Sequence, residues 1–189
     1  LATLPQIYII YLSFRNTKGI MWAPGYGVES YLTVFNKART AIVNTFKFSI
    51  IAIIIVIIFG TLFAYLTVRK KNIFTNLLDV LIMFPYVIPG TIFGLILLMS
   101  YNAGPLVLSG TVAIIIISYV VRRMPYTVRS SSAILRQISP STEEASLSLG
   151  YASMHTFFAV TMPLMTPGIV SGAILSWITI INELSSTLM

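Results

Sequence analysis

The segment from Phe46 to Val68 has the sequence FKFSIIAIIIVIIFGTLFAYLTV, in which the only charged residue is Lys47, next to its beginning. A helix needs roughly 20 apolar residues to cross the hydrocarbon core of a bilayer, which is about 30 Å thick. Isoleucine is also common in strands, but an apolar run of this length without turn residues is typical of a spanning helix. The sequence therefore predicts a transmembrane helix over residues 46–68.

Further apolar runs on both sides of this segment have a similar composition. Residues 74–100, 106–121 and 164–183 could each span a membrane, and residues 1–14 could be the last part of another span. Across all 189 residues, 57% are hydrophobic and only 9% are charged, whereas soluble domains carry about 25% charged residues. So few charges cannot cover the surface of a soluble domain. We therefore expect an all-α fold, a polytopic transmembrane helix bundle that forms one domain over residues 1–189.

The two ends of the sequence both lie close to apolar runs. The first residue is Leu1 rather than methionine, and the last, Met189, closely follows the run over residues 164–183. A signal peptide would begin with basic residues and end at a cleavage site with small residues, and neither is present. We therefore expect an incomplete transmembrane domain that belongs to a longer protein.

Basic residues stand at the ends of the apolar runs and predict the orientation of the spans. Short loops with Lys and Arg tend to remain cytoplasmic, which places the turn Arg69–Lys71 and the segment over residues 122–163 inside. The loop over residues 101–105 has no charge and would lie outside, together with residues 15–39, although these contain basic residues. The net charge of +7 is explained by these positions, and no basic stretch alternates with aromatic residues. We therefore expect a lipid bilayer, and no nucleic acid, as a partner.

Pro85, Pro89 and Gly90 lie in the middle of the predicted span over residues 74–100. A proline removes a backbone donor and clashes with the preceding turn, so it kinks a helix. Membrane helices accept such a break where neighbouring helices or cavity water satisfy the freed carbonyl groups. The break fits either an ordinary kinked helix or a bend that shapes a translocation path, and Gly90 with Gly94 would let another helix approach closely.

The polar segment over residues 122–163 contains the start and stop signals of a short helix. Ser141 and Glu144 fit a capping box, and the acidic residues Glu143 and Glu144 suit the positive end of the helix dipole. Gly150 would end this helix after about two turns. A helix of this length is marginal alone, so it must pack either on the inner surface of the bundle or in a groove of a partner protein.

A second short helix would begin at Ser153 and end before Pro163, because proline does not continue a helix. Together with the first helix, this segment resembles the EAA loop in the permeases of binding-protein-dependent ABC importers. The residues that carry the resemblance have the spacing of that loop: Glu144-Ala145-Ser146, Gly150, Val160, Met162 and Pro163. Ser146, Val160 and Met162 are conservative departures from the alanine, isoleucine and leucine of the family pattern.

Two further motifs resemble the ferric-iron branch of this family, namely Ile88-Pro89-Gly90-Thr91 and Glu183-Leu184-Ser185-Ser186-Thr187. Permeases of that branch often join two halves of six spans, and the chain would correspond to most of one half. The resemblance implies a transmembrane permease for ferric iron or a related small solute in a bacterial inner or plasma membrane. Its implied partners are ABC ATPase subunits, an extracytoplasmic solute-binding protein, and a second permease half or copy.

The resemblance also implies which residues couple the permease to the ATPase. The helix between Ser141 and Gly150 would be the coupling helix, which inserts into a groove of the ATPase subunit. The implied coupling residues are Ser141, Glu143, Glu144, Ala145, Ser146, Gly150 and Pro163. The sequence has no Gly-x-x-x-x-Gly-Lys-Ser/Thr loop to bind phosphates. We therefore expect no catalytic residue and no cofactor on this chain, with ATP and Mg²⁺ bound by the partner ATPase.

Two carboxylates lie within predicted spans, where an ionisable group is costly and often functional. Asp79 is close in sequence to the turn Arg69–Lys71, which predicts an ion pair at the cytoplasmic interface. Glu183 lies near the outer end of the last span and fits either a structural hydrogen bond or the lining of the translocation path. His155 has no cysteine or second histidine with which to bind a metal, so we expect an ordinary polar residue and no metal site.

Two other classes of membrane protein fit part of this pattern. A secondary transporter or a channel would share the apolar runs, the broken helix and the carboxylates within spans, and a membrane scaffold is a third interpretation. Neither needs a capped cytoplasmic helix with Gly150 and Pro163 at the spacing of the family. Association with an ATP-hydrolysing subunit would therefore distinguish the importer from both alternatives.

Overall fold

The computed structural model describes residues 3–19 and 21–183. The chain divides into two compact units, Leu1–Thr45 and Phe46–Met189, here called unit 1 and unit 2. The buried hydrophobic residues of the described chain all lie in unit 2, and the helices of unit 1 bury none of their residues. The hydrophobic core of the described residues is thus confined to the second unit.

Unit 1 contains two short helices and a β-hairpin: α1 (Leu4–Ser13), β1 (Arg15–Lys18), β2 (Met21–Tyr26) and α2 (Glu29–Lys37). The strands pair antiparallel, with Thr17 opposite Trp22. The guanidinium of Arg15 lies 5.5 Å from the centre of the Trp22 ring. The sequence did not indicate this hairpin, because its strands are short and lack the apolar alternation of a half-buried sheet. α1 has 10 residues, about half of what a span needs.

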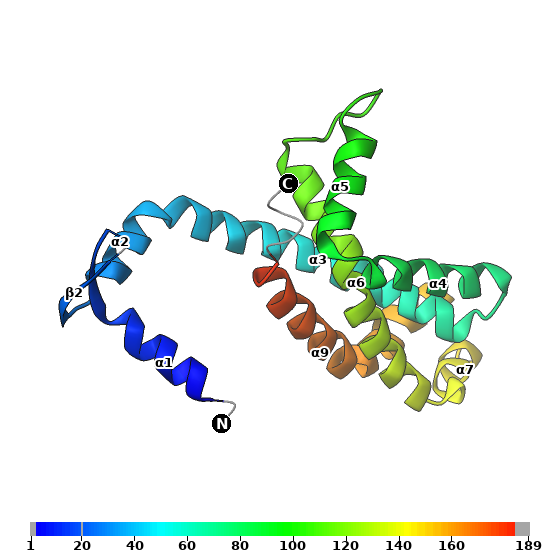
Figure 1. Ribbon diagram of the computed structural model, residues 1–189. Coiled ribbons are helices and arrows are strands. Elements are labelled where there is room, and N and C mark those ends of the chain that lie inside the picture. The colour runs from blue at the N-terminus through cyan, green and yellow to red at the C-terminus, as the bar shows by residue number, and fades with distance from the viewer. Residues whose placement is uncertain (1–2, 20, 184–189) are drawn as a thin grey trace. The chain divides into compact units, whose positions relative to one another are not determined.

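Unit 2 is built from helices (Figure 1). They are α3 (Arg39–Arg69, of which residues 39–45 belong to unit 1), α4 (Ile73–Val87), α5 (Gly90–Tyr101), α6 (Val112–Gln137), α7 (Pro140–Ser148), α8 (Ser153–Thr156), a π-helical turn (Phe157–Thr161) and α9 (Met162–Ile181). α6 and α9 lie side by side and make the most extensive contact between helices of the unit.

The span predicted over residues 74–100 is broken into two helices, α4 with 15 residues and α5 with 12. Their directions differ by 110°, and Figure 1 shows α5 leaving α4 at this steep angle. Ile88 and Pro89 have extended ψ values of 129° and 139°. The break therefore lies where the prolines predict it, but two consecutive extended residues turn the chain much further than a single proline kink.

The third predicted span, over residues 106–121, overlaps a helix that begins later and extends further, α6. α6 has 26 residues and is about 39 Å long, so Arg122 and Arg123 lie midway along a helix rather than at its cytoplasmic end. Both arginines form ion pairs with Glu183, and charges that are neutralised inside a bundle need not end a helix. The segment expected to be cytoplasmic, over residues 122–163, therefore begins within α6 and is helical up to Gln137.

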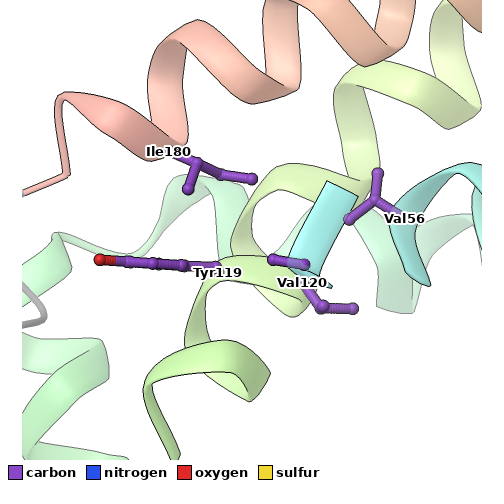
Figure 2. Packing of buried hydrophobic residues seen from close by; sticks show 5 residues of the cluster. Val56, Tyr119, Val120 and Ile180 are labelled. Carbon is purple, nitrogen blue, oxygen red and sulfur yellow. The ribbon is translucent and has the colours of Figure 1, made fainter. Parts of the chain in front are cut away.

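α3, α6 and α9 enclose two groups of buried hydrophobic side chains. The first consists of Ala52, Val56, Tyr119, Val120 and Ile180, and Figure 2 shows side chains from the three helices meeting there. The second consists of Ala64, Leu135, Met165 and Ile169. Each group takes residues from all three helices, so these helices form the structural frame of the unit.

Two glycines of α9 bring its backbone close to that of α6. A Cβ atom at Gly172 would lie 2.7 Å from the Cα of Thr127, and one at Gly168 would lie 2.8 Å from the carbonyl oxygen of Ser130. Glycines four residues apart on one helix are a known device for close packing in membranes. Close packing was expected at Gly90 and Gly94, of which Gly94 is buried, and Gly168 and Gly172 form a second pair of this kind.

Burial follows the pattern of a membrane protein. Large apolar side chains face outward, as for Ile54 and Ile58, which are 52% and 58% exposed, while Ser49, Thr127 and Ser176 are buried. Among the described residues, α3 and the continuous helical run Ser153–Ile181 are long and apolar enough to cross a membrane, and α4 with α5 would add a third if they form one broken span. The predicted fold class, a transmembrane helix bundle, is confirmed.

Candidate functional site

α7 is the helix predicted to carry the function, and it begins earlier than its sequence indicated. Ser139, not Ser141, is its N-cap, and the Ser139 hydroxyl accepts a 3.4 Å hydrogen bond from the Ser141 amide. Pro140 follows at the first helical position, where its fixed φ and missing N–H are favourable. The capping box predicted for Ser141 and Glu144 is therefore wrong, because Thr142 and not Glu144 occupies the third helical position.

The end of α7 has the geometry predicted for Gly150. This residue adopts a φ of +87°, a left-handed conformation that costs a glycine little and other residues more. The Gly150 amide donates to the carbonyl of Leu147 at 2.9 Å, and the Tyr151 amide donates to that of Ser146 at 3.4 Å. These two bonds form a Schellman motif. The prediction that the helix ends at Gly150 is confirmed.

One face of α7 is attached to the end of α3 by a buried charged cluster. The Arg69 Nε donates to Glu143 Oε1 at 2.8 Å, and the Tyr65 hydroxyl donates to Glu143 Oε2 at 3.2 Å. Arg69 also donates to the carbonyl of Ile138, just before α7, at 2.9 Å. The Arg69 and Glu143 side chains are each only 12% exposed. Glu143 thus fixes α7 to α3, in addition to its favourable position in the first helical turn.

The same face of α7 contacts the helical run that leads into α9. The hydroxyls of Ser146 and Thr156 are 2.9 Å apart and buried. Ala152, not Ser153, is the N-cap of this run. The run does not stop before Pro163, as was predicted, but continues to Ile181. The wider π-helical turn Phe157–Thr161 directly precedes α9 and its early proline, and such a turn changes the backbone pairing that a proline would otherwise disrupt.

The opposite face of α7 is open. Glu144, Ala145 and Ser148 are exposed there. Leu147, one turn after Glu143, lies beside the attached face and is 44% exposed. A hollow of about 630 Å³ lies on that attached side, between the helix, the end of α3 and the run that begins at α8, and its lining includes Arg69, Lys70, Glu143, Glu144, Leu147 and Met154. The exposed face and the hollow beside it offer a partner both apolar and charged groups.

The remaining predicted site residues lie in two other places. Pro85, Pro89 and Gly90 form the break between α4 and α5. Glu183 follows the end of α9. The helical run Ser153–Ile181, which begins with α8, has 29 residues and is about 40 Å long, so Glu183 lies far from the beginning of that run. Residues 184–187 of the motif that begins at Glu183 lie outside the described residues. The residues predicted for coupling and those predicted for the translocation path therefore do not form one site.

Residues 56–189 match the family described as "Binding-protein-dependent transport system inner membrane component". The chain belongs to this family. Its members are the membrane component of such transport systems and not the catalytic one, so this permease is an inner-membrane protein without an enzymatic role.

Curated relatives of the permease include proteins with named solutes. The ferric transport system permease protein FbpB of Actinobacillus pleuropneumoniae is 33% identical over 180 residues, which are 92% of this chain and 26% of that protein. A putative ferric transport system permease protein, FbpB 1 of Haemophilus influenzae, is 32% identical over 92% of this chain and 28% of its own length. The molybdenum transport system permease protein ModB of Escherichia coli is 27% identical over 78% of this chain and 69% of its own length. The chain thus spans about a quarter of the two ferric relatives.

Several contacts of the permease were not foreseen from its sequence. Asp79 pairs with Arg129 of α6 at 3.2 Å, and not with the turn Arg69–Lys71 as predicted. His155 stacks on Tyr151 with ring centres 4.6 Å apart. Arg69 was assigned only a topological role, although its position directly after the end of an apolar run could also have suggested a partner on the following cytoplasmic segment. The partners themselves are distant in sequence, and no local pattern identifies them.

Proposed function

We propose that the full-length protein is the permease of an ATP-driven importer and that α7 is the helix through which a separate ATPase moves it. The single observation that supports this most strongly is the division of α7 into two faces. Glu143 and Ser146 attach one face to α3 and to the run that becomes α9, whereas Glu144, Ala145 and Ser148 on the other face are exposed. A helix that transmits movement needs both a firm attachment and a free docking surface.

The attachments give a route for the movement. A displacement of α7 would act on α3 through the Arg69–Glu143 pair and on α9 through Ser146 and Thr156. α3 and α9 share both buried hydrophobic groups with α6, so they respond as packed bodies rather than as flexible segments. The bundle would then open its cavity alternately to either side, with the closed and open states selected by the nucleotide state of the ATPase.

ATP and Mg²⁺ belong to the partner in this proposal. The sequence contains no phosphate-binding loop, and the docking face of α7 offers one carboxylate, Glu144, with apolar neighbours rather than a set of anion-binding groups. The further partners are a solute-binding protein on the outer side and a second permease half or copy. The family description, which names binding-protein-dependent transport, supports the first of these.

The solute in this proposal is ferric iron or a related small solute. Two relatives with the word ferric in their names, at 33% and 32% identity, cover 92% of the chain. The molybdenum permease ModB is 27% identical, so the same framework serves solutes of different chemistry. A secondary transporter would not need the exposed face of α7, and no contact in the described chain favours it.

The experiment that tests the proposal is co-purification of the full-length protein with its ATPase. Glu144→Lys reverses a charge on the docking face, and Gly150→Asp strains the left-handed end of α7. We expect both variants to retain membrane insertion and to lose the ATPase. Gly110→Asp is the matched control, because Gly110 also has a positive φ, +75°, with open space for a Cβ, but lies before α6. Normal ATPase retention in both α7 variants would contradict the proposal.

A further inference from the structure

Two arginines share a single carboxylate inside the helix bundle. Arg122 Nη1 donates to Glu183 Oε1 at 2.7 Å, and Arg123 pairs with the other carboxylate oxygen, Oε2. The three side chains are 11%, 14% and 4% exposed, respectively. The cluster therefore carries one positive charge more than it neutralises, in a position where an uncompensated charge is expensive.

No other carboxylate of unit 2 compensates this charge. Besides Glu183, residues 46–189 contain three acidic residues: Asp79, Glu143 and Glu144. Asp79 pairs with Arg129 and Glu143 with Arg69, while Glu144 is exposed on α7, beyond the other end of α6. The excess charge is thus a property of the fold and not of one side-chain conformation.

Unused hydrogen-bond donors accompany the excess charge. Within the described chain, the Nε atoms of Arg122 and Arg123 are buried and have no hydrogen-bond partner. Tyr126, one turn further along α6, lies within hydrogen-bonding reach of Arg123. A buried donor without an acceptor costs free energy, so the two guanidinium groups have room for an acceptor that the described residues do not supply.

A hollow beside α6 is lined by Tyr126, the residue one turn after Arg123. It has a volume of about 410 Å³ and is lined by Met83, Tyr86, Pro125, Tyr126, Arg129, Ser130 and Leu175. The rings of Tyr86 and Tyr126 meet edge to face with centres 5.5 Å apart. Tyr86 directly follows Pro85, so the hollow lies against the end of α4 that leads into the break. Its polar lining consists of hydroxyls and one guanidinium and contains no carboxylate.

We propose that Arg122, Arg123 and Tyr126 bind the transported solute in transit and that this solute is an anion, either a small oxyanion or an anionic complex of a metal ion. This inference rests on the proposed importer function and specifies the solute class. Guanidinium groups bind oxyanions through paired N–H donors, whereas the excess positive charge repels a bare metal cation. If the solute is ferric iron, it passes this place as an anionic complex.

Glu183 is a positioning residue in this site. It holds the two guanidinium groups on either side of one carboxylate and reduces their summed charge from +2 to +1. A transit site must bind strongly enough for entry and weakly enough for release. Without Glu183 the site would carry both charges and would hold an anion more tightly and release it more slowly.

The test measures how anion binding follows the net charge of the cluster. The full-length permease with its ATPase is purified into nanodiscs, and binding of radiolabelled sulfate, molybdate and ferric citrate is compared with that of a radiolabelled divalent nickel ion. Arg123→Gln lowers the excess charge to zero and should weaken binding of at least one anionic probe by about tenfold or more. Glu183→Gln should strengthen it, and the double variant, with the wild-type excess of +1, should bind as the wild type does. Arg136→Gln, an exposed arginine of the same helix, should have no effect.

A purely structural role for the cluster predicts that all three variants lose stability and binding together, without this order. The double variant keeps the test decisive if Glu183→Gln alone does not fold. The inference is overturned if no anionic probe binds the wild type, if binding ignores Arg123→Gln, or if binding changes while uptake into proteoliposomes does not, which would identify a resident counter-ion. ATPase retention is scored in the same preparations, so loss of the anion site with the ATPase still bound leaves the proposed importer intact.

Discussion

Arg69 and Glu143 form the most firmly held contact of α7, and their separation should uncouple the permease rather than dissociate its ATPase. Arg69→Gln leaves the 12% exposed Glu143 carboxylate with Tyr65 as its remaining partner. Breaking a buried ion pair from one side costs about 3 kcal/mol, which would loosen α7 from α3. We expect the ATPase to co-purify normally, because the Glu144 face is untouched, while solute uptake per ATP hydrolysed falls severalfold.

Lys71→Gln is the control for this prediction. Lys71 lies two residues after Arg69, is exposed and does not line the hollow beside α7, and the described residues give it no ion pair. Its removal should leave both ATP hydrolysis and uptake unchanged. Uptake that stays tightly coupled to hydrolysis in Arg69→Gln would show that the attachment of α7 to α3 does not transmit the movement.

Glu143 and Glu144 show what a sequence can and cannot say about one residue. The pattern around them predicted a short helix that ends at Gly150, and it does, because the left-handed turn is a local property. It assigned the structural contact to Glu144 and left Glu143 as a dipole charge, which is the reverse of what the structure shows. The difference comes from the start of the helix. Both Ser139 and Ser141 are suitable N-caps, and only Pro140, which favours the first helical position, distinguishes them.

The packing of α9 on α6 depends on Gly172, and even one added methyl group should disturb it. In Gly172→Ala the new Cβ would meet the Thr127 backbone at 2.7 Å, so the two helices must separate. Overpacking of this kind costs about 1–3 kcal/mol. We expect the midpoint of thermal unfolding in detergent to fall by several degrees. Val170→Leu adds one carbon to the outward face of the same helix, where the side chain is 49% exposed, and should leave the midpoint unchanged; an equal fall in both variants would contradict this account.

Helix ends were harder to predict than helices. The break near Pro89 was predicted from its prolines. Its angle of 110° depends on two consecutive extended residues, Ile88 and Pro89, and the sequence does not distinguish this conformation from a simple kink. α6 was expected to end at Val121 because basic residues usually mark the membrane surface. That rule applies to unpaired charges. It does not hold for Arg122 and Arg123, because both form ion pairs with Glu183, about 60 residues further along the chain.

For the chain as a whole, composition was sufficient to predict that lipid surrounds the helices. A chain with 57% hydrophobic and 9% charged residues must expose apolar side chains, and it does so along α3 and α9, while small and polar residues such as Ser131 and Thr161 are buried. Composition says nothing about which helices become neighbours. The contacts that carry the proposals, Arg69 with Glu143 and Arg122 with Glu183, join residues 74 and 61 positions apart.

The orientation of unit 2 in the membrane follows from α6, which separates two exposed segments by its length of about 39 Å. α7 follows its end at Gln137, beside the basic turn after α3, and should be cytoplasmic. The loop over residues 102–111 precedes its beginning and should face outward.

The sequence has no cysteine, so single cysteines can report on both sides in a full-length protein freed of any others. Asn102→Cys and Ser148→Cys are both at exposed positions, and Ser176→Cys, at a fully buried one, is the unreactive control. A membrane-impermeant maleimide added to intact cells should label Asn102→Cys alone, and Ser148→Cys should react only after permeabilisation. Labelling of Ser148→Cys in intact cells would place α7 on the outer side, where no ATPase could reach it.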